Sequence, residues 1–368
     1  MKKAFLSFPA CKRPAIGRLA IGVLATLALL GLTAQPSSAT ERAKDLFGAK
    51  KLPAAAAPQS FGFYSKGCFA GGVALPMEGS TWEVMRPSRN RRWGHPAMIA
   101  LIEKLSRDAT AIGWPGLLLG DISQPRGGPM TTGHASHQIG LDADIWFTPM
   151  PAQRLTISQR ENMSSVSLVN DKTHRVKENL WSPVYARLLR QAASYPEVER
   201  ILVNPGIKKK LCDTVTGDRS WLHKIRPFWG HDSHFHVRIS CQPGSPDCKR
   251  QQATPTDDGC GKPLAWWFTD EPWRPNKNPD APKARDLMTM ANLPRQCQAV
   301  LDAPGPASAE AVTYRGGGTP AETAPAIAQA APDQAPDQAT DTPFLPAGAS
   351  AFAATPESIP LPLARPKN

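Results

Sequence analysis

The chain has 368 residues, of which 41% are hydrophobic and 20% are charged. This composition supports a sizeable core and excludes both a wholly disordered chain and a mini-protein that must be cross-linked to fold. The formal net charge of +12 favours an anionic partner, but the sequence lacks a long Lys/Arg run, a zinc-finger pattern and an aromatic RNA-binding signature, so we expect no nucleic-acid partner.

The first 39 residues follow the order of a secretory signal peptide. Residues 1–18 are basic, residues 19–34 form an apolar run, and small residues precede a cut after Ala39. The run of about 16 residues is shorter than the roughly 20 that a membrane-spanning helix needs. We therefore predict a signal peptide over residues 1–39 and no stable membrane span after its removal; an uncleaved anchor is the alternative.

Export predicts disulfide bonds, because the compartments outside the cytosol are oxidising. One cysteine, Cys11, leaves with the signal, and six remain: Cys68, Cys212, Cys241, Cys248, Cys260 and Cys297. The spacing alone favours only a local bridge from Cys241 to Cys248, across a turn, and leaves the other pairings open. Since no C-x-x-C pair occurs, we expect no cysteine zinc site.

Residues 40–302 are predicted to form the folded domain. Apolar residues at helical spacing predict a helix from Pro96 to Ile112, and Ser182 before Pro183 predicts the start of another. Short apolar runs predict strands over residues 117–119, 141–147, 201–203 and 234–239. Because helices and strands alternate irregularly, we expect an α+β fold in which an antiparallel sheet carries the functional site.

Residues 303–368 have a different composition from the domain before them. They hold 18 alanines and 12 prolines, and they repeat the tetrapeptide A-P-D-Q at 331–334 and 335–338. Such a segment cannot bury enough apolar surface to offset the entropy of ordering it. We therefore predict a disordered tail from residue 303.

Six of the eight histidines fall in three tight groups, which favours a metal site. The groups are His134 with His137, His174 beside Asp171, and His231 with His234 and His236. On a strand, alternate side chains share a face, so His234 and His236 are expected to project one way while Phe235 and Val237 enter the core.

The same alternation places Asp142 and Asp144 on one face of their strand. Gly140 permits a tight turn before them, which would bring His137 beside Asp144. Two imidazoles and a carboxylate converging from two strands, with a fourth position open to water, are typical of catalytic zinc. The nucleophile motifs H-E-x-x-H, S-x-x-K and G-x-S-x-G are absent from the sequence, so a metal-activated water is the best candidate.

The motifs carry a family resemblance. His137 and Asp144, with six residues between them, followed by the H-x-H at 234–236, resemble the LAS metallopeptidases. The longer strings G-H-A-S-H-Q-I-G-L-D-A-D at 133–144 and H-F-H-V-R at 234–238 resemble the penicillin-insensitive murein endopeptidase family. The similarity spans about residues 60–302, with W-G-H-P at 93–96 and V-N-P-G-I at 203–207, and leaves the Ala/Pro-rich tail outside.

The resemblance implies a zinc site and its ligands. His137, Asp144 and His236 would be ligands of a catalytic ion, and His134 would also contact metal, whereas Asp171 and His174 would hold a second ion. It further implies three disulfides, Cys68–Cys297, Cys212–Cys260 and Cys241–Cys248. The implied activity is hydrolysis of D-alanyl–meso-diaminopimelyl cross-links of peptidoglycan in the periplasm, without a penicillin-sensitive serine.

The roles of the remaining polar residues follow from that chemistry. We expect His234 to act as general base, with His231 orienting it or stabilising the oxyanion. Basic residues beside the motifs would bind substrate carboxylates: Arg126, Arg226 and Arg238, together with Lys224.

Three other functions remain open on the sequence. The same zinc set could serve a D-Ala-D-Ala carboxypeptidase or dipeptidase. A wall-binding protein could hold zinc without turnover, and a polyanion-binding protein could carry these histidines incidentally. The sequence specifies neither the preference for D,D or L,D bonds nor an oligomeric state.

Overall fold

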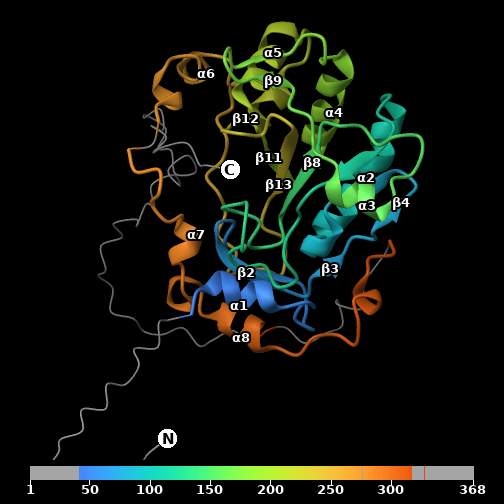
Figure 1. Ribbon diagram of the computed structural model, residues 1–368, viewed down its shortest axis with the longest axis vertical. Coiled ribbons are helices and arrows are strands. Elements are labelled where there is room, and N and C mark those ends of the chain that lie inside the picture. The colour runs from blue at the N-terminus through green and yellow to red at the C-terminus, as the bar shows by residue number, and fades with distance from the viewer. Residues whose placement is uncertain (1–40, 276, 317–326, 328–368) are drawn as a thin grey trace, which may run out of the picture. The chain divides into compact units, whose positions relative to one another are not determined.

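A mixed sheet runs through the domain in the computed structural model, which describes residues 41–275, 277–316 and 327 (Figure 1). Its strands lie in the order β12 (Ile225–Pro227), β11 (Val198–Val203), β13 (His234–Ile239), β8 (Asp142–Trp146), β7 (Leu117–Leu119), β5 (Trp82–Val84) and β4 (Glu78–Gly79). The four strands from β11 to β7 are antiparallel to one another, while β12 and β5 each pair in parallel. The predicted α+β class and the four predicted strands are confirmed.

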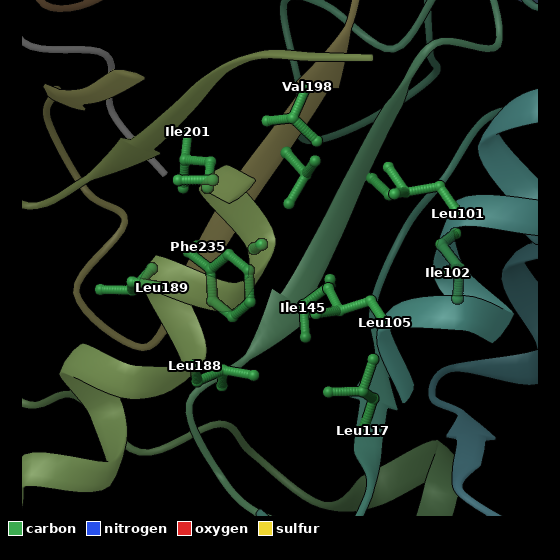
Figure 2. Close-up of a cluster of buried hydrophobic side chains, with 14 of the residues drawn as sticks. Leu101, Ile102, Leu105, Leu117, Ile145, Leu188, Leu189, Val198, Ile201 and Phe235 are labelled. Carbon is green, nitrogen blue, oxygen red and sulfur yellow. The ribbon is translucent and has the colours of Figure 1, made fainter. Parts of the chain in front are cut away.

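Two predicted helices cover one face of this sheet. They are α2 (Pro96–Ala111), whose first turn is capped by the His95 imidazole, and α4 (Pro183–Ser194), which begins directly after Ser182. Figure 2 shows their leucines gathered around Ile145 of β8 and Phe235 of β13. Because strand side chains alternate, burying Phe235 and Ile145 against the helices leaves the polar residues of β8 and β13 on the opposite face.

The other elements surround this frame and a second, smaller core. That core joins α1, the β1–β2 hairpin and α8 around Phe47, Phe61 and Val300. The remaining bounds are α1 (Ala43–Ala49), β1 (Gln59–Phe63), β2 (Lys66–Ala70), β3 (Val73–Ala74), η1 (Pro87–Arg89), β6 (Trp93–Gly94), α3 (Ile157–Asn162), β9 (Val169–Asn170), β10 (Arg175–Val176), α5 (Pro205–Thr214), η2 (Ser220–Lys224), α6 (Lys262–Trp266), η3 (Glu271–Trp273), α7 (Ala284–Leu287), η4 (Met290–Asn292), α8 (Gln296–Asp302) and η5 (Glu310–Val312).

All three disulfides implied by the family resemblance are present. They are Cys68–Cys297, Cys212–Cys260 and Cys241–Cys248. The first ties β2 to α8 within the smaller core, across 229 residues of sequence, whereas the last closes a turn of 7 residues. Disulfides persist in oxidising compartments, so this framework fits an exported protein.

Replacing Cys68 and Cys297 together by alanine is expected to lower the free energy of unfolding by about 2–5 kcal/mol. The reason is that this bridge closes the longest loop, and both cysteines are buried in the smaller core. Urea unfolding followed by fluorescence measures the loss. The Cys241→Ala, Cys248→Ala pair is the control, and a larger loss in the control would contradict the expectation.

Residues 303–316, the first part of the predicted tail, pack against the domain. The Tyr314 N–H donates to the Ala74 carbonyl at 2.9 Å, and Ala309 and Val312 pack against Phe69 and Trp93. Composition alone did not predict these contacts, because a few apolar side chains find partners more than 200 residues away in the sequence.

Two sequence predictions concern residues outside the described part of the chain. They are the signal peptide over residues 1–39 and the tail over 317–326 and 328–368. Within the described residues, none of the helices combines the length and the apolar composition that crossing a membrane requires.

Candidate metal centre

The β8–β13 ladder brings a carboxylate and an imidazole together on the face away from the helices. Asp144 is paired directly with His236, and His234 with Trp146. His236 Nδ1 lies 3.2 Å from Asp144 Oδ1, and both side chains are almost completely buried. Phe235 and Val237 enter the helix-covered core, so the predicted alternation along this strand is confirmed.

The loop between β7 and β8 carries His137 to the same place. Its backbone has φ of 68°, and its N–H donates to Asp142 Oδ2 at 2.9 Å. The ring Nδ1 lies 2.6 Å from the Ile122 carbonyl. Because a carbonyl only accepts, Nδ1 carries the proton and Nε2 is left with a lone pair, 3.4 Å from Asp144 Oδ1.

Asp144 is the centre around which four imidazoles gather. Its Oδ1 faces His137 and His236, while its Oδ2 lies 3.4 Å from His134 Nδ1 and 3.6 Å from His234 Nε2. The donor atoms of His134, His137 and Asp144 lie within 4.8 Å of one another, and His236 lies beside them.

Three buried atoms around Asp144 have no hydrogen-bond partner among the described residues. One is His236 Nε2, which lies beside the Asp142 carboxylate; the other two are His137 Nε2 and Asp144 Oδ1, which face each other. Leaving buried acceptors unpaired is costly, and a cation placed between them would satisfy both. The chain's own residues therefore fit a metal ion, and the mixed nitrogen and oxygen donors suit a divalent transition metal.

Further carboxylates orient the outer sides of two imidazoles. Asp121 Oδ2 lies 3.0 Å from His134 Nε2, and Asp142 Oδ1 lies 3.0 Å from His236 Nε2. Carboxylates in this position fix ring orientation and make the facing nitrogen a better metal ligand. The sequence analysis assigned no role to Asp121, whose only signal was its place directly after the β7 strand.

The electrostatics keep Asp144 ionised. Burial alone would raise its pKa, but the imidazoles of His137, His234 and His134 hold the pKa well below the usual value for aspartate. The carboxylate is therefore available as a ligand over the whole neutral range.

The last two histidines line the same centre. The His231 ring lies 5.0 Å from the His234 ring, and His231 Nδ1 donates to the Trp229 carbonyl at 2.8 Å. Burial lowers the pKa of His234, and burial together with His234 lowers the pKa of His231 well below its usual value. Both rings are therefore neutral near pH 7, and His234 is partly open to solvent.

Comparison with known proteins assigns the chain to a family. The family model described as penicillin-insensitive murein endopeptidase matches residues 60–302. The chain belongs to the penicillin-insensitive murein endopeptidase family. It is therefore a hydrolytic peptidase, and it carries the metal-capable group of His134, His137 and Asp144.

Three curated relatives are named penicillin-insensitive murein endopeptidase. The one from Haemophilus influenzae is 44% identical over 243 residues, which cover 66% of this chain and 82% of the relative. That from Yersinia enterocolitica is 41% identical over 251 residues, covering 68% and 88%. That from Klebsiella pneumoniae is 40% identical over 280 residues, covering 76% and 97%.

The Asp171 and His174 pair does not belong to the group formed by His134, His137 and Asp144. Both residues belong to the β9–β10 hairpin, where Asp171 is exposed. The His174 ring stacks on Trp273 with centroids 3.6 Å apart. Neither residue is part of the one group of three or more metal-capable donors in the described chain, so a second ion here stays a prediction.

Arg126 does not serve as a substrate-binding residue, contrary to the sequence-based expectation. Its guanidinium is buried and donates to the backbone carbonyls of Leu52, Val300, Leu301 and Ala303. It thereby joins the N-terminal segment to the end of α8. A donor already saturated by carbonyls inside the protein has nothing left to offer a peptide.

The structure also differs from the predicted substrate-binding role of Arg238. Its side chain has 0% exposure, makes two hydrogen bonds to Asp142 and one to Gln251, and lies over the Tyr64 ring. It is therefore a buried structural cation. Arg226 is half-buried on β12, and its contact with substrate stays a prediction.

Proposed function

We propose that this family member is a zinc-dependent endopeptidase that hydrolyses D-alanyl–meso-diaminopimelyl cross-links of peptidoglycan in the periplasm. The observation that carries the proposal is the pair of buried, unpartnered acceptors on His137 and Asp144 beside His236. Two histidines, one aspartate and an open side form the usual ligand set of catalytic zinc. The names of the curated relatives support murein as the substrate.

The ligand roles follow from which atoms face Asp144. His137 would bind through Nε2, His236 through Nδ1 and Asp144 through its carboxylate, with His134 Nδ1 in reach on the other oxygen. When bound, zinc lowers the pKa of a water ligand to about 7 and polarises the scissile carbonyl. The buried carboxylates Asp121 and Asp142 keep the outer nitrogens of His134 and His236 engaged.

The proton is handled by His234 and His231. His234 is neutral, partly exposed and 3.6 Å from Asp144 Oδ2, so its Nε2 can accept the proton of the attacking water and return it to the leaving amine. His231 keeps a lone pair on Nε2, because its Nδ1 donates to a backbone carbonyl, and its ring lies 5.0 Å from that of His234. It would orient His234 or stabilise negative charge on the carbonyl oxygen.

Purified cross-linked muropeptide dimers, incubated with the zinc-loaded mature protein, are expected to give monomers in mass spectra. Penicillin should not reduce this cleavage, because β-lactams acylate a serine and the sequence offers no S-x-x-K nucleophile. Chelation of zinc should abolish cleavage and added zinc should restore it.

A histidine outside the cluster, His223, supplies the matched control. His223 lies on η2 with Nδ1 beside Thr254 Oγ1, so His223→Ala should cleave normally while His137→Ala should not. Release of terminal D-Ala from intact dimers would replace the proposal with a carboxypeptidase. Intact dimers with zinc bound would replace it with a wall-binding protein.

A further inference from the structure

Arginine side chains gather beside the metal centre on the side where His134 is exposed. Asp121 Oδ2 accepts from Arg91 Nη1 at 2.8 Å and from Arg89 Nη1 at 3.1 Å, and the same oxygen contacts His134. Arg285 donates to the carbonyl of Gly133, the residue before His134. Two guanidinium groups therefore share the Asp121 carboxylate, and a third lies at the neighbouring Gly133, which leaves this rim of the site positive.

The two arginines that share Asp121 differ in how many of their N–H donors are left without a bond to the protein. The Arg91 side chain is 5% exposed and also bonds Thr131 and Thr132, so its charge is matched and enclosed. The Arg89 side chain is 45% exposed, and within the described residues only its Nη1 is hydrogen-bonded to the protein. Because Asp121 already neutralises Arg91, the charge of Arg89 is not balanced there, and its remaining N–H groups face solvent.

The loop that presents Arg89 is rigid. Arg86 and Asn90 flank η1 with φ of 54° and 52°, a conformation that non-glycine residues keep only where the surroundings enforce it. The enforcing contacts are present: Ser88 bonds the Glu161 carboxylate through both N–H and Oγ, and the Asn90 amide bridges the Lys51 carbonyl and the Trp93 indole.

An arginine held in place by two strained residues differs from an ordinary solvated surface charge. Surface arginines lose side-chain entropy when they bind, and a fixed loop removes part of that cost. Backbone strain of this kind concentrates at ligand sites, where it serves pre-organisation. A cationic group fixed this close to His134 is suited to an anion on the substrate.

The cross-link itself offers such an anion next to the bond to be cut. In a D-alanyl–meso-diaminopimelyl link, the carbon that carries the amide nitrogen also carries a free carboxylate. We propose that Arg89 binds this carboxylate and so makes the enzyme select cross-links whose diaminopimelate is a free acid. The inference rests on the proposed function and replaces Arg126 and Arg238 as the carboxylate-binding residues.

The test compares two synthetic cross-linked peptides that differ only in this group, free acid or primary amide. The wild-type protein is expected to favour the acid by about 10- to 100-fold in kcat/KM, as a charge-assisted hydrogen bond is lost with the amide. Arg89→Gln should erase this preference by raising KM for the acid, while kcat and zinc content stay unchanged. Arg89→Lys should keep part of the preference.

Arg107→Gln is the matched control, because Arg107 is an exposed arginine on α2 that pairs only loosely with Glu103. It should leave the acid preference intact. Calorimetric binding of the two peptides to zinc-depleted protein gives a second readout that needs no turnover, and the acid should bind about 10-fold more tightly unless Arg89 is replaced.

The outcomes separate this inference from the proposed function. Equal cleavage and equal binding of acid and amide by the wild type would overturn it. A loss of zinc in Arg89→Gln, with both peptides cut equally poorly, would also overturn it, since Arg89 would then only support Asp121. If neither peptide is cut but the Arg89-dependent binding preference persists, the proposed function fails while the carboxylate site stands.

Discussion

His236→Ala is expected to lose both zinc and turnover, whereas His234→Ala is expected to retain zinc and lose turnover by about 10²- to 10⁴-fold. The difference follows from burial. His236 is buried and directly opposite Asp144 in the β8–β13 register. His234 lies two residues earlier on β13 and is partly open to solvent. Metal content by mass spectrometry and single-turnover cleavage measure the two effects.

Chemical rescue sharpens this division of roles. The His234→Ala variant leaves a partly exposed space beside an intact metal group, so added imidazole should restore part of its turnover. The same imidazole should do nothing for His236→Ala, which lacks a ligand. Equal zinc loss in the two variants would contradict the assignment of His234 as the general base.

The sequence predicted the core of this site because strand periodicity is a local property. Alternation along residues 234–239 placed His234 and His236 on one face and Phe235 in the core, and the structure has this arrangement. The spacing of His137 and Asp144, with Gly140 between them, likewise predicted a return of the chain. In each case the information lies within about ten neighbouring residues.

Reasoning from neighbouring residues could not predict which groups the arginines contact. Arg126 is bonded to carbonyls near residue 300, and Arg238 is paired with Asp142, 96 residues earlier in the chain. A basic residue beside a motif looks the same in the sequence whether it faces a substrate or a buried carboxylate. Only the fold shows that Arg89, which no motif singles out, keeps open donors beside the metal centre.

The contacts of residues 303–316 escaped prediction for a related reason. The Ala/Pro-rich composition from residue 303 predicts disorder when averaged over the segment. In the structure, a short stretch around Val312 and Tyr314 meets an apolar surface and the edge of β3. An average over many residues hides a contact made by three or four.

Asp142 connects the stability of the fold with the geometry of the metal centre. It accepts two hydrogen bonds from Arg238 and one from the His137 N–H, and it lies against His236 Nε2. Burial alone would raise its pKa, yet Arg238, followed by His236, holds the pKa well below the usual value. The carboxylate is therefore charged throughout the neutral range, paired with a cation that is fully buried as well.

Asp142→Asn is expected to lower the free energy of unfolding by about 3–5 kcal/mol, because it takes from the fully buried Arg238 the carboxylate that accepts two of its hydrogen bonds. Zinc affinity should fall by about 10- to 100-fold as well, since the rings of His137 and His236 lose a common support. Denaturant unfolding of the zinc-free protein and competitive zinc titration measure the two effects separately. Asp218→Asn, which breaks the exposed pair with Arg190, is the control and should change both far less.

The double variant Asp142→Asn, Arg238→Gln distinguishes the two consequences. Removing the buried cation as well should recover much of the lost stability, since the cost of the single variant lies mainly in separating Arg238 from its carboxylate. Zinc affinity should stay low, because no carboxylate then faces Nε2 of His236. Recovery of zinc affinity together with stability would mean that the metal centre responds only to the global stability of the domain, and Asp142 would then have no orienting role of its own.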